Sequence, residues 1–179
     1  VGASIGAWRM ATACLDHPAE GFKRLERDYI AQHYELKPGQ KRPLAKDVSD
    51  QFGRNLRNFY GSRLEEVLCH PRYRLHILTS RGRHVLGQEG AWRTPLGYAG
   101  AFMTNMVSRR AMGAWLERVV FSSQQAALPF APHDYRTRQV ALTAANFMQA
   151  VQASCRTGGA WKQPQSNFHL HPIWLRSEE

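Results

Sequence analysis

The pattern of hydrophobic and polar positions predicts two helices at the start of the chain. Residues 4–15 are almost all apolar or small, interrupted by Arg9 and Thr12, which is typical of a helix inside a protein. Residues 18–32 have the spacing of an amphipathic surface helix with Pro18 in its first turn. Its apolar face is formed by Phe22, Leu25, Tyr29 and Ile30.

The next segment predicts a loop followed by two more helices. Residues 35–46 contain prolines, a glycine and several lysines, so they read as an exposed loop. Helices are expected over 48–60 and 63–68, and Ser62 followed by Glu65 is a capping-box pattern for the second.

A strand pattern follows. Residues 72–80 alternate, which is the period of a β-strand. One set faces one way (Tyr73, Leu75, Ile77) and the other set faces the opposite way (Arg74, His76, Leu78). Arg81 and Gly82 are expected to turn the chain, and residues 83–86 to return as a short strand.

The second half predicts a long helix, a strand and a further helix. The long helix spans 98–121, with core candidates Phe102, Met106, Trp115, Leu116 and Val120. A strand is expected over 135–142, and Thr143 as the cap of a helix that ends near Ala153. Helices that alternate with a few strands indicate an α/β fold.

The net positive charge has two interpretations. The 24 Lys and Arg against 14 Asp and Glu give a formal net charge of +10. Such a surface can simply keep the protein in solution, or it can attract an anionic membrane, a nucleic acid or a phosphate-bearing substrate. No helix presents a row of Arg or Lys and no zinc-finger pattern occurs, so we expect no nucleic-acid partner. A basic module that binds a lipid or membrane surface, or else a nucleic acid, stays open as a non-catalytic alternative.

The cysteines and histidines favour neither a disulfide framework nor a metal centre. Cys14, Cys69 and Cys155 contain no C-x-x-C pair, which indicates a reducing compartment. We therefore expect a cytoplasmic location, with attachment to a membrane surface as an option, and no cofactor. His169 and His171 share a face if they lie in a strand, but no convincing third metal ligand is close in sequence.

One motif carries chemistry. Gly2-Ala3-Ser4-Ile5-Gly6 fits G-x-S-x-G, in which a serine sits on a sharp strand-to-helix turn called a nucleophile elbow. The small residues leave room for the strained backbone, and the helix N-terminus that follows can stabilise an oxyanion. We call residues 2–6 the elbow from here on.

Three stretches resemble the bacterial patatin-like phospholipase family. They are the elbow with its small-residue helix (Val1–Ala11), the strand and turn over His70–Leu86, and Leu128–Ala153. The resemblance implies a three-layer fold with a central, mostly parallel sheet flanked by helices. It covers residues 1–155 as a partial domain and leaves 156–179 as a divergent tail.

The resemblance also implies a lipid acyl hydrolase with a Ser–Asp dyad, acting on an ester lipid or phospholipid. Ser4 would be the nucleophile, Gly2 and Gly6 the elbow glycines, and the backbone N–H of Ile5 an oxyanion donor. The dyad aspartate of the family lies in an Asp-Gly motif, and an upstream glycine-rich loop supplies further oxyanion donors.

The chain departs from this family at both motifs. None of its five aspartates precedes a glycine (Asp16, Asp28, Asp47, Asp50, Asp134), and the glycine-rich loop is missing. We therefore expect a fragment, truncated at both ends, with little activity by itself. Asp134 followed by His169 or His171 fits the order of an ordinary hydrolase triad, although a turn residue and exposed tail histidines are the simpler interpretation.

Overall fold

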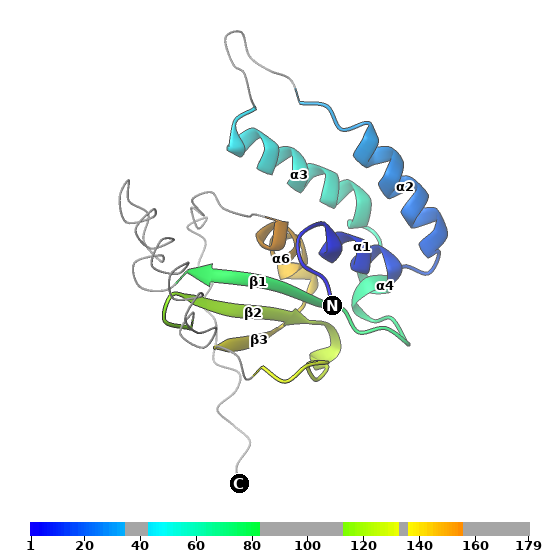
Figure 1. Ribbon diagram of the computed structural model, residues 1–179. Coiled ribbons are helices and arrows are strands. Elements are labelled where there is room, and N and C mark those ends of the chain that lie inside the picture. The colour runs from blue at the N-terminus through cyan, green and yellow to red at the C-terminus, as the bar shows by residue number, and fades with distance from the viewer. Residues whose placement is uncertain (35–42, 83–112, 133–135, 156–179) are drawn as a thin grey trace.

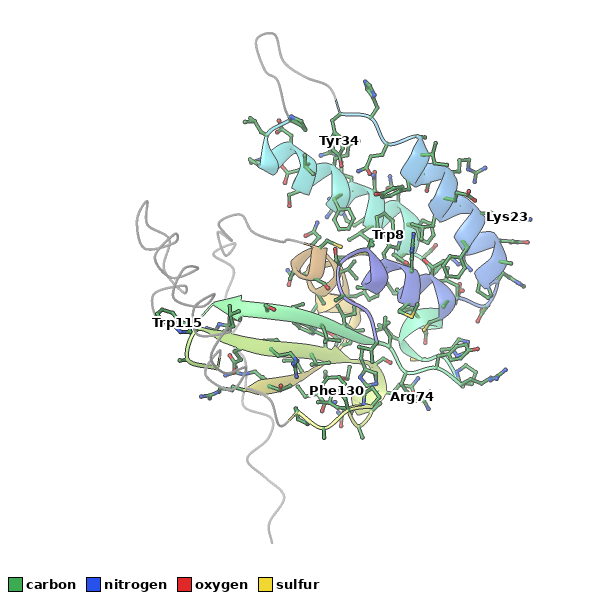
Figure 2. The ribbon with its side chains drawn as sticks, viewed as in Figure 1. Trp8, Lys23, Tyr34, Arg74, Trp115 and Phe130 are labelled. Atoms are coloured by element: carbon green, nitrogen blue, oxygen red, sulfur yellow. The ribbon has the colours of Figure 1, made fainter. Side chains whose placement is uncertain are left out.

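The described part of the chain folds into a small sheet with the helices gathered on one side of it (Figure 1), and Figure 2 shows the side chains in the same view. The structure is a computed structural model and describes residues 1–34, 43–82, 113–132 and 136–155. In chain order the elements are α1 (Ile5–Ala13), α2 (Pro18–Ile30), α3 (Ala45–Tyr60), α4 (Leu64–Leu68), β1 (His76–Gly82), β2 (Leu116–Ser122), the 3₁₀ turn η3 (Ser123–Gln125), β3 (Thr137–Ala141) and α6 (Ala144–Cys155). The expectation of an α/β fold is confirmed.

The sheet is mixed. Its strand order is β1-β2-β3, with β1 and β2 antiparallel and β2 and β3 parallel. Along the β1–β2 pair, His76 lies opposite Ser122 and Gly82 opposite Leu116. Gly2 adds a parallel bridge to Ile77 on the free side of β1. The start of the chain is thereby held at the sheet edge, directly before α1.

The core lies between the sheet and the helices. In Figure 1, α1 and α6 lie close to β1, and α2 and α3 lie outside them. Edge-to-face aromatic contacts connect α1, α3 and α6 in the order Trp8, Phe59, Tyr60 and Phe147. Such aromatic pairs add to the free energy of burial, so this chain of rings fixes α1 against its neighbours.

A buried polar network holds α1 to α3. The hydroxyl of Tyr60 donates to the carbonyl of Trp8 at 3.0 Å, and lies 2.8 Å from Oγ1 of Thr12. Burial raises the pKa of Tyr60, so the phenol stays protonated and can donate. Because buried polar groups are costly unless hydrogen-bonded, these bonds favour one placement of α1 over others.

Most predicted elements are confirmed. Helices α2, α3, α4 and α6 and strand β3 fall on the predicted segments, although α3 begins at Ala45 rather than Val48. The start of α6 is fixed by Asn146, whose Oδ1 accepts the N–H of Thr143 at 2.8 Å. Thr143 thus stands at the cap position that was predicted for it.

The predicted helix over 98–121 is wrong in its final part. Leu116 and Val120 belong to strand β2, and Trp115 immediately precedes it, whereas Phe102 and Met106 lie outside the described residues. Apolar residues spaced as on a helix also fit the inward positions of a strand. Here Val119, Val120 and Phe121 favour the strand, and pairing with β1 satisfies their backbone.

Three local predictions also need correction. Arg81 and Gly82 lie within β1 instead of forming a turn, and residues 83–86 lie outside the described residues. The capping box at Ser62 does not form: Arg63 precedes α4, and its guanidinium pairs with Glu66 at 2.9 Å. Helix α1 is buried on one face only, because Arg9 and Met10 are exposed. The prediction that α1 is buried on all sides is therefore wrong, and its exposed face includes the apolar side chains of Ile5 and Met10.

Candidate active site

The elbow has the predicted strand-turn-helix geometry. Gly2 donates its N–H to the carbonyl of His76 at 2.8 Å and accepts the N–H of Leu78 at 2.8 Å. These are bonds of a parallel strand pair. Ala3 and Ser4 then turn the chain, and α1 begins at Ile5. Two residues thus separate a strand position from a helix.

Ser4 has a strained backbone. Its φ is 54° and its ψ is −134°, a combination close to a region that only glycine normally occupies. A residue held in such a conformation costs about 1–3 kcal/mol, so the surrounding structure must stabilise it. Strain of this kind is common where a side chain has to be presented for function.

The hydroxyl of Ser4 is available. A serine that precedes a helix usually accepts an N–H of the first turn with its side chain, but Ser4 makes no such cap. Across the described ranges, no hydrogen bond involves its Oγ, and the residue is half-exposed. At this positive φ, the Ser4 hydroxyl therefore does not cap α1 as a serine in this position normally does.

The first backbone donor of α1 is also available. The N–H of Gly6 donates to the carbonyl of Ala3 at 2.9 Å, and the N–H of Ala7 to that of Ser4 at 2.9 Å. The N–H of Ile5 has no acceptor within the part of the chain that the structure describes. It lies at the positive end of the helix dipole, equivalent to about half an elementary charge. This is the donor that the sequence predicted for the oxyanion.

The two elbow glycines differ. A Cβ on Gly2 would lie 2.6 Å from Cα of Ala7 and 2.6 Å from the carbonyl oxygen of Gly6, so the tight turn requires glycine here. A Cβ on Gly6 would meet no described atom within 4 Å. Of the two small-residue positions in the motif, only Gly2 is dictated by a close approach.

A second serine supports the elbow from α6, and sequence analysis missed it. The N–H of Ser4 donates to Oγ of Ser154 at 2.8 Å, and that hydroxyl donates to the carbonyl of Leu78 at 2.6 Å. Ser154 is buried. Nothing in the sequence marks it, because the two serines lie 150 positions apart and no motif links them.

Two of the four described aspartates form ion pairs away from the elbow. Asp28 pairs with Arg24 and Asp50 with Lys46, and both pairs lie on the outer helices. The remaining described aspartates are Asp16, which follows α1, and Asp47, in the first turn of α3. In residues 1–34, 43–82, 113–132 and 136–155, no carboxylate bonds to Ser4. Three predicted candidates, Asp134, His169 and His171, lie outside these ranges.

His76 and Cys14 have structural roles. Nδ1 of His76 lies 2.9 Å from Oγ of Ser122, and both residues are buried, so His76 is a hydrogen-bonded core histidine. Burial lowers the pKa of its imidazole. Cys14 is buried as a small apolar side chain, and burial raises the pKa of its thiol.

Several residues close to Ser4 in sequence are exposed, and most of them are apolar. Val1 and Ile5, on either side of Ser4, are exposed, and so are Arg9 and Met10 further along α1. A groove of about 460 Å³ lies elsewhere. It is lined by α4 and by Ala144, which stands at the opposite end of α6 from Ser154. The groove is therefore no extension of the elbow.

Comparison of the chain with protein-family models, with curated proteins and with solved structures finds no match. Over the described ranges, no group of three His, Cys, Asp or Glu is placed to hold a metal ion. No helix in those ranges is both long and apolar enough to cross a bilayer. The elbow thus gives the main physical basis for a function.

Proposed function

We propose that this chain carries the nucleophile of a patatin-like serine acyl hydrolase that acts on ester lipids. The supporting observation is the conformation of Ser4. Its backbone is held at φ 54° and ψ −134° between a strand position and a helix N-terminus, and its hydroxyl is unused within the described residues. A buried core serine would not need this strain, whereas a presented nucleophile does.

The chemistry follows from these atoms. Oγ of Ser4 attacks the ester carbonyl, and the N–H of Ile5 donates to the developing oxyanion. The hydroxyl proton passes to the dyad carboxylate that the resemblance implies, and then to the alcohol as the ester C–O bond breaks and an acyl-enzyme is left. Water then attacks the acyl-enzyme, breaks the bond between the acyl group and Oγ, releases the fatty acid and regenerates the serine. The family resemblance assigns the carboxylate to an Asp-Gly motif that this sequence lacks, so slow turnover is expected.

An apolar substrate fits the surface beside the elbow. Val1 and Ile5 are exposed on either side of Ser4, so an acyl chain can contact them without displacing bound water from polar groups. Arg9 follows one turn later on α1 and is exposed, which favours a phospholipid over a neutral ester. The complete three-layer fold with a mostly parallel sheet is part of the same proposal.

A non-catalytic lipid-surface module is the second candidate. It is supported by the net charge of +10 and by the lack of a carboxylate bonded to Ser4 in the described residues. Such a module would bind anionic vesicles equally well with and without the Ser4 hydroxyl.

A labelling experiment separates the two candidates. The chain is incubated with a fluorophosphonate probe and, in parallel, with a p-nitrophenyl ester, and the modified residue is located by mass spectrometry. Matched variants are Ser4→Ala and Ser123→Ala, a buried serine whose Oγ accepts the N–H of Leu75 at 2.9 Å. Labelling at Ser4 that is lost only in Ser4→Ala supports the hydrolase. A folded chain without labelling that still binds anionic vesicles supports the surface module.

A further inference from the structure

The hydroxyl of Ser154 is placed between two backbone groups that both belong to the frame of the elbow. It accepts the N–H of Ser4 at 2.8 Å and donates to the carbonyl of Leu78 at 2.6 Å. The direction of both bonds is fixed, because a peptide N–H can only donate and a carbonyl can only accept. The neighbouring N–H of Leu78 bonds to Gly2 at 2.8 Å, so the same β1 residue holds both sides of the turn.

The peptide groups around Ser4 are accordingly almost all engaged. Its N–H bonds to Ser154, and its carbonyl accepts the N–H of Ala7 at 2.9 Å. Within the described residues, the N–H groups of Ala3 and Ile5 have no acceptor. Ser154 therefore occupies the amide of Ser4, and the amide of Ile5 at the start of α1 is left for an oxyanion.

We propose that Ser154 is a positioning residue for the Ser4 nucleophile, acting through the Ser4 N–H to hold the strained turn and its hydroxyl in place. The effect of Ser154 on the reactivity of Ser4 rests on the proposed function, whereas its effect on the Ser4 backbone does not. Without the Ser154 hydroxyl, the Ser4 peptide is free to rotate toward an ordinary cap conformation. In that conformation the Ser4 side chain would accept an N–H of the first turn of α1.

The test compares two serines that make the same kind of bond. Ser154→Ala and Ser123→Ala each remove a buried hydroxyl that accepts a backbone N–H, from Ser4 and from Leu75. We expect Ser154→Ala to label with fluorophosphonate about ten- to a hundredfold more slowly, because a small misplacement of a reacting group has effects of that size. Ser123→Ala should label at nearly the wild-type rate, and Ser154→Thr, which keeps the hydroxyl, should recover most of the rate.

Amide hydrogen exchange gives a second measurement that needs no activity. In the wild-type chain the Ser4 amide should be protected at least about tenfold more than the Ile5 amide, since only the former is bonded. Ser154→Ala should abolish that protection, and Ser123→Ala should preserve it. An unprotected Ser4 amide in the wild-type chain would overturn the proposal without any variant.

The outcomes separate the two proposals. Equal labelling of Ser154→Ala and wild type, or equal slowing by Ser154→Ala and Ser123→Ala, overturns the positioning role and leaves the hydrolase intact. No labelling of the wild-type chain counts against the hydrolase. In that case the exchange measurement alone decides whether Ser154 holds the turn.

Discussion

Within the described residues, two turns hold non-glycine residues at positive φ, and they differ in what their side chains contact. One is the elbow, with Ser4 at φ 54°. The other is the glutamine turn, Ser123–Gln125, with Gln124 at φ 52° and Gln125 at φ 50°. Gln124 has a ψ of 29°, which lies in the left-handed helical well, whereas the ψ of −134° at Ser4 does not.

The side chain of Gln124 stabilises its own turn. Its Nε2 donates to the carbonyl of Leu68 at 3.2 Å and to that of His70 at 3.1 Å, joining the turn to the segment after α4. The Ser4 hydroxyl makes no comparable bond within the described residues, and the strain there is held by Ser154 instead. Positive φ alone therefore does not indicate a reactive residue. At Ser4 the positive φ occurs together with a hydroxyl that is unused within the described residues and with a hydrogen bond to the backbone from another helix.

The largest difference between the turns is expected in chemical reactivity. Ser4→Ala should reduce fluorophosphonate labelling at least about a thousandfold, to background, because removal of a nucleophile removes the covalent step. Gln124→Ala should leave the labelling rate unchanged while lowering the free energy of unfolding by about 0.5–1.5 kcal/mol through its lost hydrogen bonds. Labelling rates and denaturant midpoints check both. A loss of labelling in Gln124→Ala would contradict the expectation that reactivity depends on the elbow and not on the glutamine turn.

The next effect concerns the steric requirement of the elbow. Gly2→Ala places a Cβ 2.6 Å from Cα of Ala7, so it should destabilise the fold by about 1–3 kcal/mol and slow labelling as the turn opens. Gly6→Ala is the matched control. It has open space, and it should be neutral or stabilising by up to about 1 kcal/mol, since alanine favours a helix over glycine. Chemical denaturation gives the free energy of unfolding of both variants. Equal destabilisation by Gly2→Ala and Gly6→Ala would contradict a steric requirement for glycine at position 2.

A smaller effect isolates backbone strain from chemistry. Ser4→Gly and Ser4→Ala both lack the hydroxyl, but glycine tolerates the observed φ and ψ. We expect Ser4→Gly to be more stable than Ser4→Ala by about 1 kcal/mol, measured as a difference in unfolding free energy. The same pair of substitutions at Gln124 should differ less, because its conformation is one that side chains adopt more readily. A reversed order would mean that Ser4 is not strained.

The smallest effect involves His76, which contacts both turns. Its carbonyl accepts the N–H of Gly2, and its ring bonds to Ser122, just before the glutamine turn. Burial lowers the pKa of His76 in the folded state, so below about pH 6.5 the unfolded chain binds the proton more readily. The contribution of the neutral His76 ring to the free energy of unfolding is thus fully present above about pH 6.5 and decreases as the pH falls below it.

Thermal unfolding between about pH 7.5 and 5.5 measures the His76 effect, since carboxylates titrate below that window. His76→Asn should reduce the fall in unfolding temperature with falling pH, because it removes the titrating ring and keeps an amide near Ser122. A decrease of the same size in this variant would assign the dependence to other histidines.

The elements that could be predicted from the sequence are those determined by a few neighbouring residues. The G-x-S-x-G spacing predicted the turn and the helix after it, because Gly2 and the small residues of α1 act over a few positions. Likewise Pro18 and the amphipathic spacing located α2. Each of these signals is contained in one segment, so no knowledge of tertiary neighbours was needed.

The part that could not be predicted depends on distant partners. Leu116–Ser122 becomes a strand because β1 supplies an antiparallel partner, and periodicity over Trp115 and Val120 does not reveal that partner. The contact of Ser154 with Ser4 joins two helices and a strand, and neither residue has an unusual local context. The role of a single hydroxyl in α6 becomes visible only once the sheet brings the segments together.

The distance along the chain between Ser4 and Ser154 has a consequence for biosynthesis. Ser4 is synthesised before Ser154, yet its backbone is held by a hydroxyl that is added 150 residues later. Contacts this far apart form late, because the intervening chain must be ordered first. A nascent chain that has not yet reached α6 should therefore lack the hydrogen bond that holds the Ser4 peptide in its unusual conformation.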